Sequence, residues 1–424
     1  MRLTLFVTLV GVGIGVAGCA VPEPGELYQS KLSRLLAPDV SAEDAQAVTA
    51  GNQDFAFALY HQLPQSQPNL VVSPYSVSRA LAQIWGGARG DTERQIASAM
   101  RFPLDQSRFH LAFDALDLKL DQMGKGARAA DGGPFQFRSV DSLFVQRGMA
   151  LEPSYLDLLS QDYGAAIRGM SFDADPEDAR LRINDWVDGM TSGRIKDLLE
   201  KGVVTADTRF ILVDAVYLSA AWKDGFDASK TKAQDFHRLD GTTVAVQMMS
   251  REAGSSVLQG EGFTAVALPY EADGLSLLVI MPDEGRFTAM EGQMDRAFLD
   301  GVVAGLQDQK VNLSLPRFKS RYPVDLQPIL TALGMGDAFT PAADLSGITG
   351  GRDLQLQSAG HQATIDVTES GTVAAAATYV GGMLTSLPPE PLRVVIDRPF
   401  LFLIREASTG TVLFLGRVED PTAG

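Results

Sequence analysis

The chain has 424 residues, with 52 acidic and 36 basic side chains and a net charge of −16. This surplus of negative charge argues against binding of nucleic acid or an anionic membrane through the body, because like charges repel. A hydrophobic share of 45% is enough for a large core, and no charge run, repeat or Gly/Ser linker divides the chain.

The N-terminus has the pattern of a signal peptide. Arg2 precedes an apolar stretch, residues 3–16, that is too short to span a bilayer comfortably. Residues 16–19, Val-Ala-Gly-Cys, resemble a bacterial lipobox, which implies cleavage after residue 18 and lipidation of Cys19. The alternative is an ordinary secretory signal in which Cys19 is incidental. We therefore expect a location at the cell envelope, as a membrane-anchored lipoprotein on the periplasmic or surface face, or secretion.

Residues 19–40 are expected to be a tether, because Pro22, Pro24, Gly25 and Pro38 disfavour regular structure. Ala20, which is not Asp, suggests sorting to the outer membrane by resemblance to lipoprotein rules. Cys19 is the only cysteine, so no disulfide can form within the chain. A G-x-G-x-x-G match at residues 13–18 lies inside the signal peptide, with no strand before it, and is rejected as a dinucleotide motif.

From residue 41 onward, the pattern of apolar residues predicts an α+β protein. Ser41 can cap a helix that carries apolar residues at helical spacing from Phe55 to Leu63, and helical patterns recur to about residue 200, for example over residues 182–191. After Phe210 the pattern changes to short apolar runs bounded by Gly, Pro or Asp, which predict strands. These runs are residues 210–213, 265–268, 275–281, 311–315, 392–396 and 411–415.

No pattern of an enzyme or a metal site is found. The four histidines, His61, His110, His237 and His361, are scattered, and the chain has no H-E-x-x-H, C-x-x-C or G-x-S-x-G motif. We interpret His361 as a structural residue, or else as a switch at a strand edge. The tryptophans Trp186 and Trp222 are expected in the core. No cofactor and no metal is predicted.

Residues 369–378 suit two conformations. Ala374, Ala375, Ala376 and Ala377 have good helix propensity, but in a strand every second side chain from Thr372 would be small and would share one face. The residues on that face, which would point inward if the strand were buried in a sheet, are Thr372, Ala374, Ala376, Thr378 and Val380. None is charged or large, so burying them between packed strands would not require the desolvation of a charge.

Eight segments follow one another in a characteristic order: residues 52–60, 69–82, 86–92, 183–198, 214–226, 315–318, 333–339 and 369–378. In this order they resemble the serpins, a family of suicide protease inhibitors. The resemblance covers roughly residues 44–421, and it implies a domain at 41–424 with about nine helices, three β-sheets and an exposed reactive-centre loop. One departure is Asp214, where the family usually has Asn, which is expected to alter local hydrogen bonding.

The resemblance implies that a serine protease cleaves the loop and is trapped covalently when the hinge enters the main sheet. The hinge residues are Glu369, Gly371, Thr372, Ala374, Ala375, Ala376, Ala377 and Thr378. The usual hinge length places the reactive bond at Thr385–Ser386, with Leu384–Thr385 and Met383–Leu384 as rivals. No Lys or Arg lies between Arg352 and Arg393, so we expect elastase-, subtilisin- or chymotrypsin-like targets.

Two other interpretations remain open at this point. A non-inhibitory binding or carrier lipoprotein could use the same fold, because a fold does not determine function. An enzyme would require a nucleophile and a base that the sequence does not show. Some family members respond to acidic polysaccharides, but no cluster of Lys and Arg supports a heparin-type cofactor here. We expect a monomer.

Overall fold

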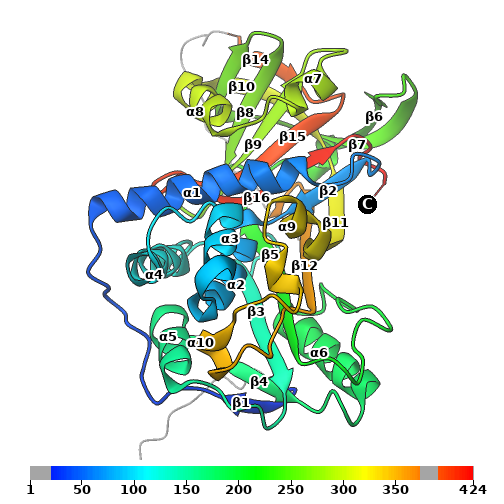
Figure 1. Ribbon diagram of the computed structural model, residues 1–424. Helices are drawn as coiled ribbons and strands as arrows, with labels where there is room; N and C mark the ends of the chain where they lie inside the picture. Colours follow the sequence, from blue (N-terminus) through cyan, green and yellow to red (C-terminus); the bar gives the residue numbers. More distant parts are fainter. Residues whose placement is uncertain (1–20, 373–389, 424) are drawn as a thin grey trace, which may run out of the picture.

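The structure is a computed structural model that describes residues 21–372 and 390–423, in which two β-sheets are packed with ten α-helices (Figure 1). This α+β arrangement was expected from the sequence, and the expectation of about nine helices is confirmed. Helix α1 lies across the molecule between the two sheets (Figure 1). None of the helices in the described residues is both long and apolar enough to cross a membrane.

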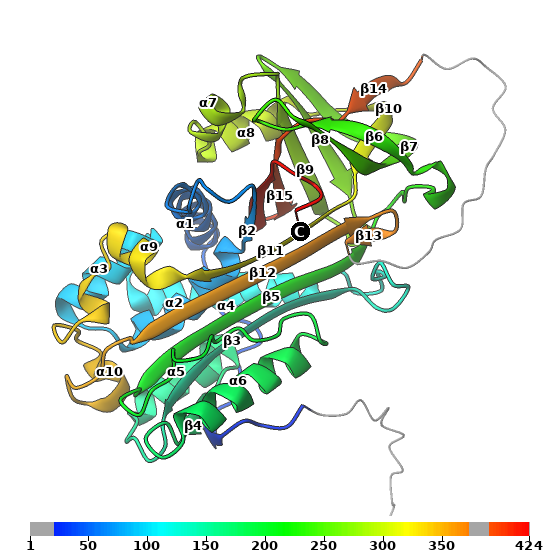
Figure 2. The ribbon, with the colours of Figure 1, turned by 90° about the vertical axis from the view of Figure 1, so that its right-hand side faces the viewer.

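The first sheet, called the main sheet below, has seven strands in the order β1-β4-β3-β5-β13-β12-β11. Their bounds are β1 Glu26–Tyr28, β4 Ile167–Met170, β3 Gln136–Gln146, β5 Phe210–Ala221, β13 Gly371–Thr372, β12 Ser358–Thr368 and β11 Phe318–Asp325. Strands β5 and β12 are parallel and pair directly from Ile211 and Ser358 to Tyr217 and Thr364. Beyond that stretch, the two residues of β13 lie between the carboxyl ends of both strands (Figure 2).

The main sheet is covered on both faces, which explains why β5 is buried along nearly its whole length. Every residue from Phe210 to Ala220 is buried. Leu212 and Val216 belong to the larger core, whereas Val213 and Ala215 face a smaller core that lies under α6 (Pro176–Met190). Figure 2 shows α6 running beside β3 and β4.

The second sheet has nine strands, in the order β14-β10-β7-β8-β9-β15-β16-β2, with β6 paired to β7. The long strand β7 pairs with β6, β10 and β8, so the described residues form two sheets, where the resemblance implied three. The bounds are β2 Asn69–Val72, β6 Lys232–His237, β7 Thr243–Gly260, β8 Phe263–Pro269, β9 Leu275–Pro282, β10 Gln307–Pro316, β14 Leu392–Val395, β15 Phe400–Glu406 and β16 Val412–Val418.

The helices begin where the sequence supplies caps. The Oγ atom of Ser41 accepts a hydrogen bond from the Asp44 amide at 3.1 Å, as predicted, and Ser73 caps α2 in the same way, ahead of Pro74. The other helix bounds are α1 Ala42–His61, α2 Pro74–Gly87, α3 Gly90–Met100, α4 Gln106–Gln122, α5 Pro153–Tyr163, α7 Phe287–Glu291, α8 Arg296–Gly305, α9 Leu326–Ala332 and α10 Ser346–Thr349. Short 3₁₀ turns cover Ala228–Lys230 and Asp337–Phe339.

The described part of the expected tether, residues 21–40, lies against the body. Its strand β1 pairs antiparallel with β4 at the edge of the main sheet. Gly25 permits the approach, since a Cβ atom there would lie 2.3 Å from the Gly169 carbonyl oxygen. The boundaries 1–18, 19–40 and 41–424 stay predictions.

Candidate functional site

The candidate site is the stretch where β5 and β12 meet, which we call the seam, together with residues 369–372 at its carboxyl end. The chain leaves β12 at Thr368, turns, and returns antiparallel as β13, with Thr372 opposite Val367 on one side and Ala220 on the other. Gly371 has a φ of 149°, and a Cβ atom there would lie 2.0 Å from the Ala220 carbonyl oxygen. Only glycine fits this position without displacing β5.

Thr372 is completely buried at the entrance of the seam. Its hydroxyl group lies 2.7 Å from the hydroxyl group of Tyr270, whose ring stacks on Trp222 at 4.5 Å between centroids. Burial raises the pKa of the Tyr270 phenol, so its proton remains available for this hydrogen bond. The indole Nε1 of Trp222 donates to the Thr368 carbonyl at 2.9 Å. Aromatic side chains therefore hold the first hinge residues in place.

Glu369 fixes the turn that precedes β13. Burial opposes ionisation of its carboxyl group, but hydrogen bonds from Arg317 and Thr231 outweigh burial and lower its pKa. The Nε atom of Arg317 lies 2.8 Å from both carboxylate oxygens of Glu369. The backbone of the turn is also fixed, because the amide groups of Phe226 and Trp222 donate to the carbonyl groups of Glu369 and Ser370 at 2.8 and 3.0 Å.

A buried pair of polar side chains crosses the seam. Asp214 on β5 and His361 on β12 face each other in the register, and both side chains are completely buried. The Nε2 atom of His361 accepts a hydrogen bond from the Ser73 amide at 3.1 Å, so this nitrogen carries a lone pair. The proton of the neutral imidazole is therefore on Nδ1, which donates to Asp214 Oδ2 at 2.7 Å. Parting the strands would break this contact.

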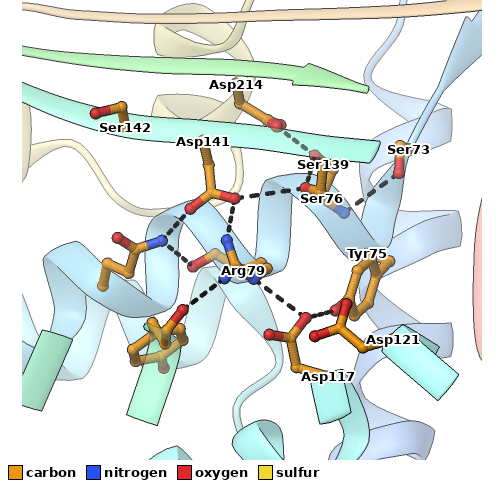
Figure 3. A network of polar contacts seen from close by, with 12 residues as sticks. Ser73, Tyr75, Ser76, Arg79, Asp117, Asp121, Ser139, Asp141, Ser142 and Asp214 are labelled. Atoms are coloured by element: carbon orange, nitrogen blue, oxygen red, sulfur yellow. Dashed lines mark hydrogen bonds and ion pairs between the residues drawn. The ribbon is translucent and has the colours of Figure 1, made fainter. Parts of the chain in front are cut away.

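A polar network continues from Asp214 into the layer of helices below the sheet (Figure 3). Ser76 on α2 donates to Asp214 and lies 2.9 Å from the Ser139 hydroxyl on β3. One turn further along α2, Arg79 pairs with Asp141 on β3 and with Asp117 on α4. Helix α2 thus holds both β3 and β5 from beneath through polar contacts.

Arg79 remains charged in this network although it is buried. Burial lowers the pKa of its guanidinium group, but Asp117 and Asp141 outweigh burial and raise it. The hydroxyl group of Tyr75 donates to Asp117, and Arg79 also donates to the Tyr163 carbonyl at 2.9 Å. Removing one member would leave buried charges without their partners.

A further strand can enter the seam only if β5 and β12 first move apart. Neighbouring strands lie about 4.8 Å apart, so β5 and β12 must separate by about that distance and lose their direct pairing. The entering strand would restore one row of hydrogen bonds on each side. The arrangement suits a change of strand pairing. The described residues also contain no group of three or more His, Cys, Asp and Glu side chains that could hold a metal ion.

The structure brings together only part of the residues singled out from the sequence. Glu369, Gly371 and Thr372 meet at the end of the seam. The remaining hinge residues, the reactive-bond candidates and the lipidation site lie outside the described residues. These are Ala374, Ala375, Ala376, Ala377, Thr378, Met383, Leu384, Thr385, Ser386 and Cys19. Their roles stay predictions.

Several residues of the site were not found from the sequence. The contact of His361 with Asp214 was not predicted, although the unusual Asp214 and the open interpretation of His361 both pointed to this position. Tyr270, Arg317 and Arg79 were missed as functional residues, since their contacts join distant parts of the chain. Trp186 and Trp222 are in the core as expected.

Comparison with known proteins identifies the family. Residues 50–421 match the family model described as Serpin (serine protease inhibitor). The chain is 33% identical over 440 residues to an uncharacterized serpin-like protein of Thermococcus kodakarensis, with all of both chains covered. It is 32% identical over 387 residues to the leukocyte elastase inhibitor of Bos taurus, covering 89% of this chain and all of the relative. Human thyroxine-binding globulin, solved in complex with thyroxine, superimposes with a TM-score of 0.80 at 28% identity, over 89% of this chain and 99% of that structure. The chain therefore belongs to the serpin family.

Proposed function

We propose that this protein inhibits serine proteases by covalent trapping, through insertion of its cleaved loop into the seam. The observation that carries this proposal is Thr372, which already lies between β5 and β12 with its side chain completely buried. Each further residue of the hinge would face the preceding residue of β5, so Gly382 would face Phe210 at the beginning of that strand. The small side chains at alternate positions from Thr372 to Val380 suit this path.

The chemistry belongs to the protease. Its serine oxygen attacks the carbonyl carbon of the reactive bond, the peptide bond breaks, and the new amino terminus leaves with the C-terminal fragment. The hinge then carries the ester-linked protease along the seam while it enters as a strand, as in the strand addition known for serpin loops. This distorts the protease before water can hydrolyse the ester. The uncleaved fold must be metastable and held by a kinetic barrier.

The target is expected to have an apolar or small specificity pocket. The bond at Thr385–Ser386, or its rivals at Leu384 and Met383, offers no cation to a trypsin-like pocket. The bovine relative named leukocyte elastase inhibitor is consistent with this class. Elastase-, subtilisin- and chymotrypsin-like enzymes differ in pocket preference by only ~1–3 kcal/mol for a methylene or two, so all three are candidates.

A carrier function is the second candidate. It is favoured by the structural similarity to thyroxine-binding globulin, which was solved with its ligand. A carrier would be cleaved in the loop without trapping the protease.

We also propose that the protein acts as a monomer on the cell envelope, anchored by a lipid on Cys19. The proposal rests on the lipobox-like residues 16–19. The described chain then begins within a few residues of the anchor. The edge of the main sheet that β1 forms would therefore lie near the membrane.

The test is to mix the protein with an elastase-like protease and with trypsin, and to separate the products under denaturing conditions. The proposal predicts a complex of protease and inhibitor that survives denaturation with the elastase-like enzyme, and a released C-terminal peptide whose mass identifies the bond. Cleavage without any complex across a panel of serine proteases would favour the carrier. Rapid stable trapping of trypsin would overturn the proposed target class.

A further inference from the structure

Residues 21–40, which we call the strap, make contacts that a passive tether would not need. The strap begins beside β4, where β1 adds a seventh strand to the main sheet. It then crosses α5, where Ser30 donates to Asp157 and the Leu35 amide donates to the Gln161 carbonyl at 2.9 Å. The strap therefore connects an edge of the sheet with the helices beneath it.

Arg34 is the most deeply placed charge of the strap. Its side chain is 19% exposed, and its guanidinium group reaches three aspartates of α4, with 2.9 Å to Asp114, 2.5 Å to Asp117 and 3.2 Å to Asp121. The Asp114 side chain is completely buried, and burial raises its pKa to about 6, against the opposing effect of Arg34. Removing Arg34 would leave the buried and partly buried aspartates of α4 without the positive charge that this residue supplies.

Arg34 also belongs to the network beneath the seam. Asp117 is shared between Arg34 and Arg79, and Arg79 holds Asp141 on β3. The strap is thus linked to the sheet by two routes, through the pairing of β1 with β4 and through α4, α2 and β3. Figure 3 shows Arg79 between Asp141 and Asp117.

The two halves of the main sheet differ in what supports them. Strands β12 and β11 contact β2, which is hydrogen-bonded to β16 in the second sheet. Strands β5 and β3 instead lie on α2, with β4 and β1 outside them. When a strand enters the seam, the β1-β4-β3-β5 half must therefore move across the helices. The strap is attached to both the moving strands and the helices.

We propose that the strap restrains the opening of the main sheet, with Arg34 as the positioning residue that holds it on α4. This inference rests on the proposed insertion mechanism and adds a control of its rate. Undocking of Arg34 frees the β4 side of the sheet to move, so it lowers the barrier to strand entry. The alternative is a purely structural role, in which β1 only protects the edge of β4 from pairing with other chains.

The experiment measures how fast a synthetic peptide with the sequence of residues 371–382 enters the sheet of the whole protein. Uptake is followed by the appearance of a species that unfolds at a higher temperature. The variants are Arg34→Ala, Arg34→Lys and Glu23→Gln. The last is a matched control on the same strap, because Glu23 pairs with Arg168 at 2.7 Å at a more exposed position.

We expect Arg34→Ala to take up the peptide about tenfold faster than the wild type, which corresponds to about 1.4 kcal/mol in the barrier. Arg34→Lys should fall between the two, since an ammonium group cannot make the same forked contacts. Glu23→Gln should stay within about twofold of the wild type, as expected for an exposed ion pair. If Arg34→Ala does not fold, Asp121→Asn, which removes only the most exposed partner of Arg34, should give a smaller acceleration in the same direction.

Two outcomes would overturn the inference. One is an unchanged rate of peptide uptake in Arg34→Ala or Asp121→Asn. If the melting temperature of such a variant falls while its uptake rate stays the same, the strap has a purely structural role. The other is an equal acceleration in Glu23→Gln. Both leave the proposed function intact, because the peptide still enters. Absence of uptake in every variant would instead refute strand insertion and the restraint together.

Discussion

The substitution Thr372→Arg tests the hinge at the residue where insertion begins. Thr372 is completely buried between Ala220 and Val367, and its hydroxyl group contacts Tyr270 at 2.7 Å. An arginine would have to place its guanidinium group beside the stacked rings of Tyr270 and Trp222. We therefore expect the hinge of this variant to stay out of the seam.

The magnitude follows from the loss of the hydroxyl contact and the burial of a charge. The hydrogen bond contributes about 1 kcal/mol, and an unpaired buried cation costs several kcal/mol. If only about 3 kcal/mol of this appears in the insertion barrier, insertion slows by roughly 100-fold. Insertion competes with hydrolysis of the ester, so most encounters should then end with free protease and cleaved inhibitor.

The assay is the number of inhibitor molecules consumed for each protease molecule inactivated, together with the ratio of complex to cleaved product on a denaturing gel. Thr372→Val is the matched control, because it keeps the shape and loses only the hydroxyl group. Its insertion rate should stay within about twofold of the wild type, because Thr372 already makes this hydrogen bond before insertion. If Thr372→Arg is cleaved at the same bond and traps protease as efficiently as the wild type, the reasoning about the hinge is refuted.

Three further predictions concern the seam, the core and the N-terminus. Asp214→Ala removes the acceptor of the Nδ1 proton of His361 and one of the two partners of the Ser76 hydroxyl, so thermal unfolding should reveal a loss of about 1–3 kcal/mol. Asp214→Asn should restore most of this stability, and equal stability of all three proteins would contradict the role of this contact. Burial lowers the pKa of His110 to about 3, so its neutral form is favoured in the fold and its contribution to stability is lost as the pH falls from about 6.5 towards 3. The difference in unfolding free energy between the wild type and His110→Gln, from urea titrations, should therefore shrink by about 1.4 kcal/mol per pH unit over this range, and a pH-independent difference would show that His110 does not titrate in this way. Cys19→Ser should move the protein from the membrane fraction to the soluble fraction of cells, whereas extraction of this variant only by detergent would exclude a lipid on Cys19.

Local pattern was sufficient for elements whose signals lie within a few residues. The cap at Ser41 predicted the start of α1, and the apolar run from Phe210 predicted the start of β5, although the strand continues to Ala221. Strand β3, Gln136–Gln146, was not predicted, because polar residues interrupt its pattern and its burial depends on β5 and β4. The strand β1 has only three residues after Pro24 and Gly25, and it is stabilised by β4, about 140 positions later in the chain.

The sequence predicted only the part of the site that depends on residue type, which is the hinge. The small residues from Thr372 suited either a helix or a strand, and the resemblance to the serpins assigned them and Gly371 to a hinge. The structure adds the close approach of Gly371 to Ala220. The contact between Asp214 and His361 depends on the parallel register of β5 and β12, which residue patterns do not specify. Arg34 and Asp114 meet for the same reason, through packing of distant segments.

The most direct test of insertion is thermal unfolding before and after cleavage of the loop within residues 381–386. If the freed hinge enters the seam, it gains hydrogen bonds from both β5 and β12, and the stored strain is released. The cleaved protein should then unfold in a separate transition at a clearly higher temperature than the intact protein. An unchanged midpoint after complete cleavage at this site would contradict insertion and would favour the carrier function.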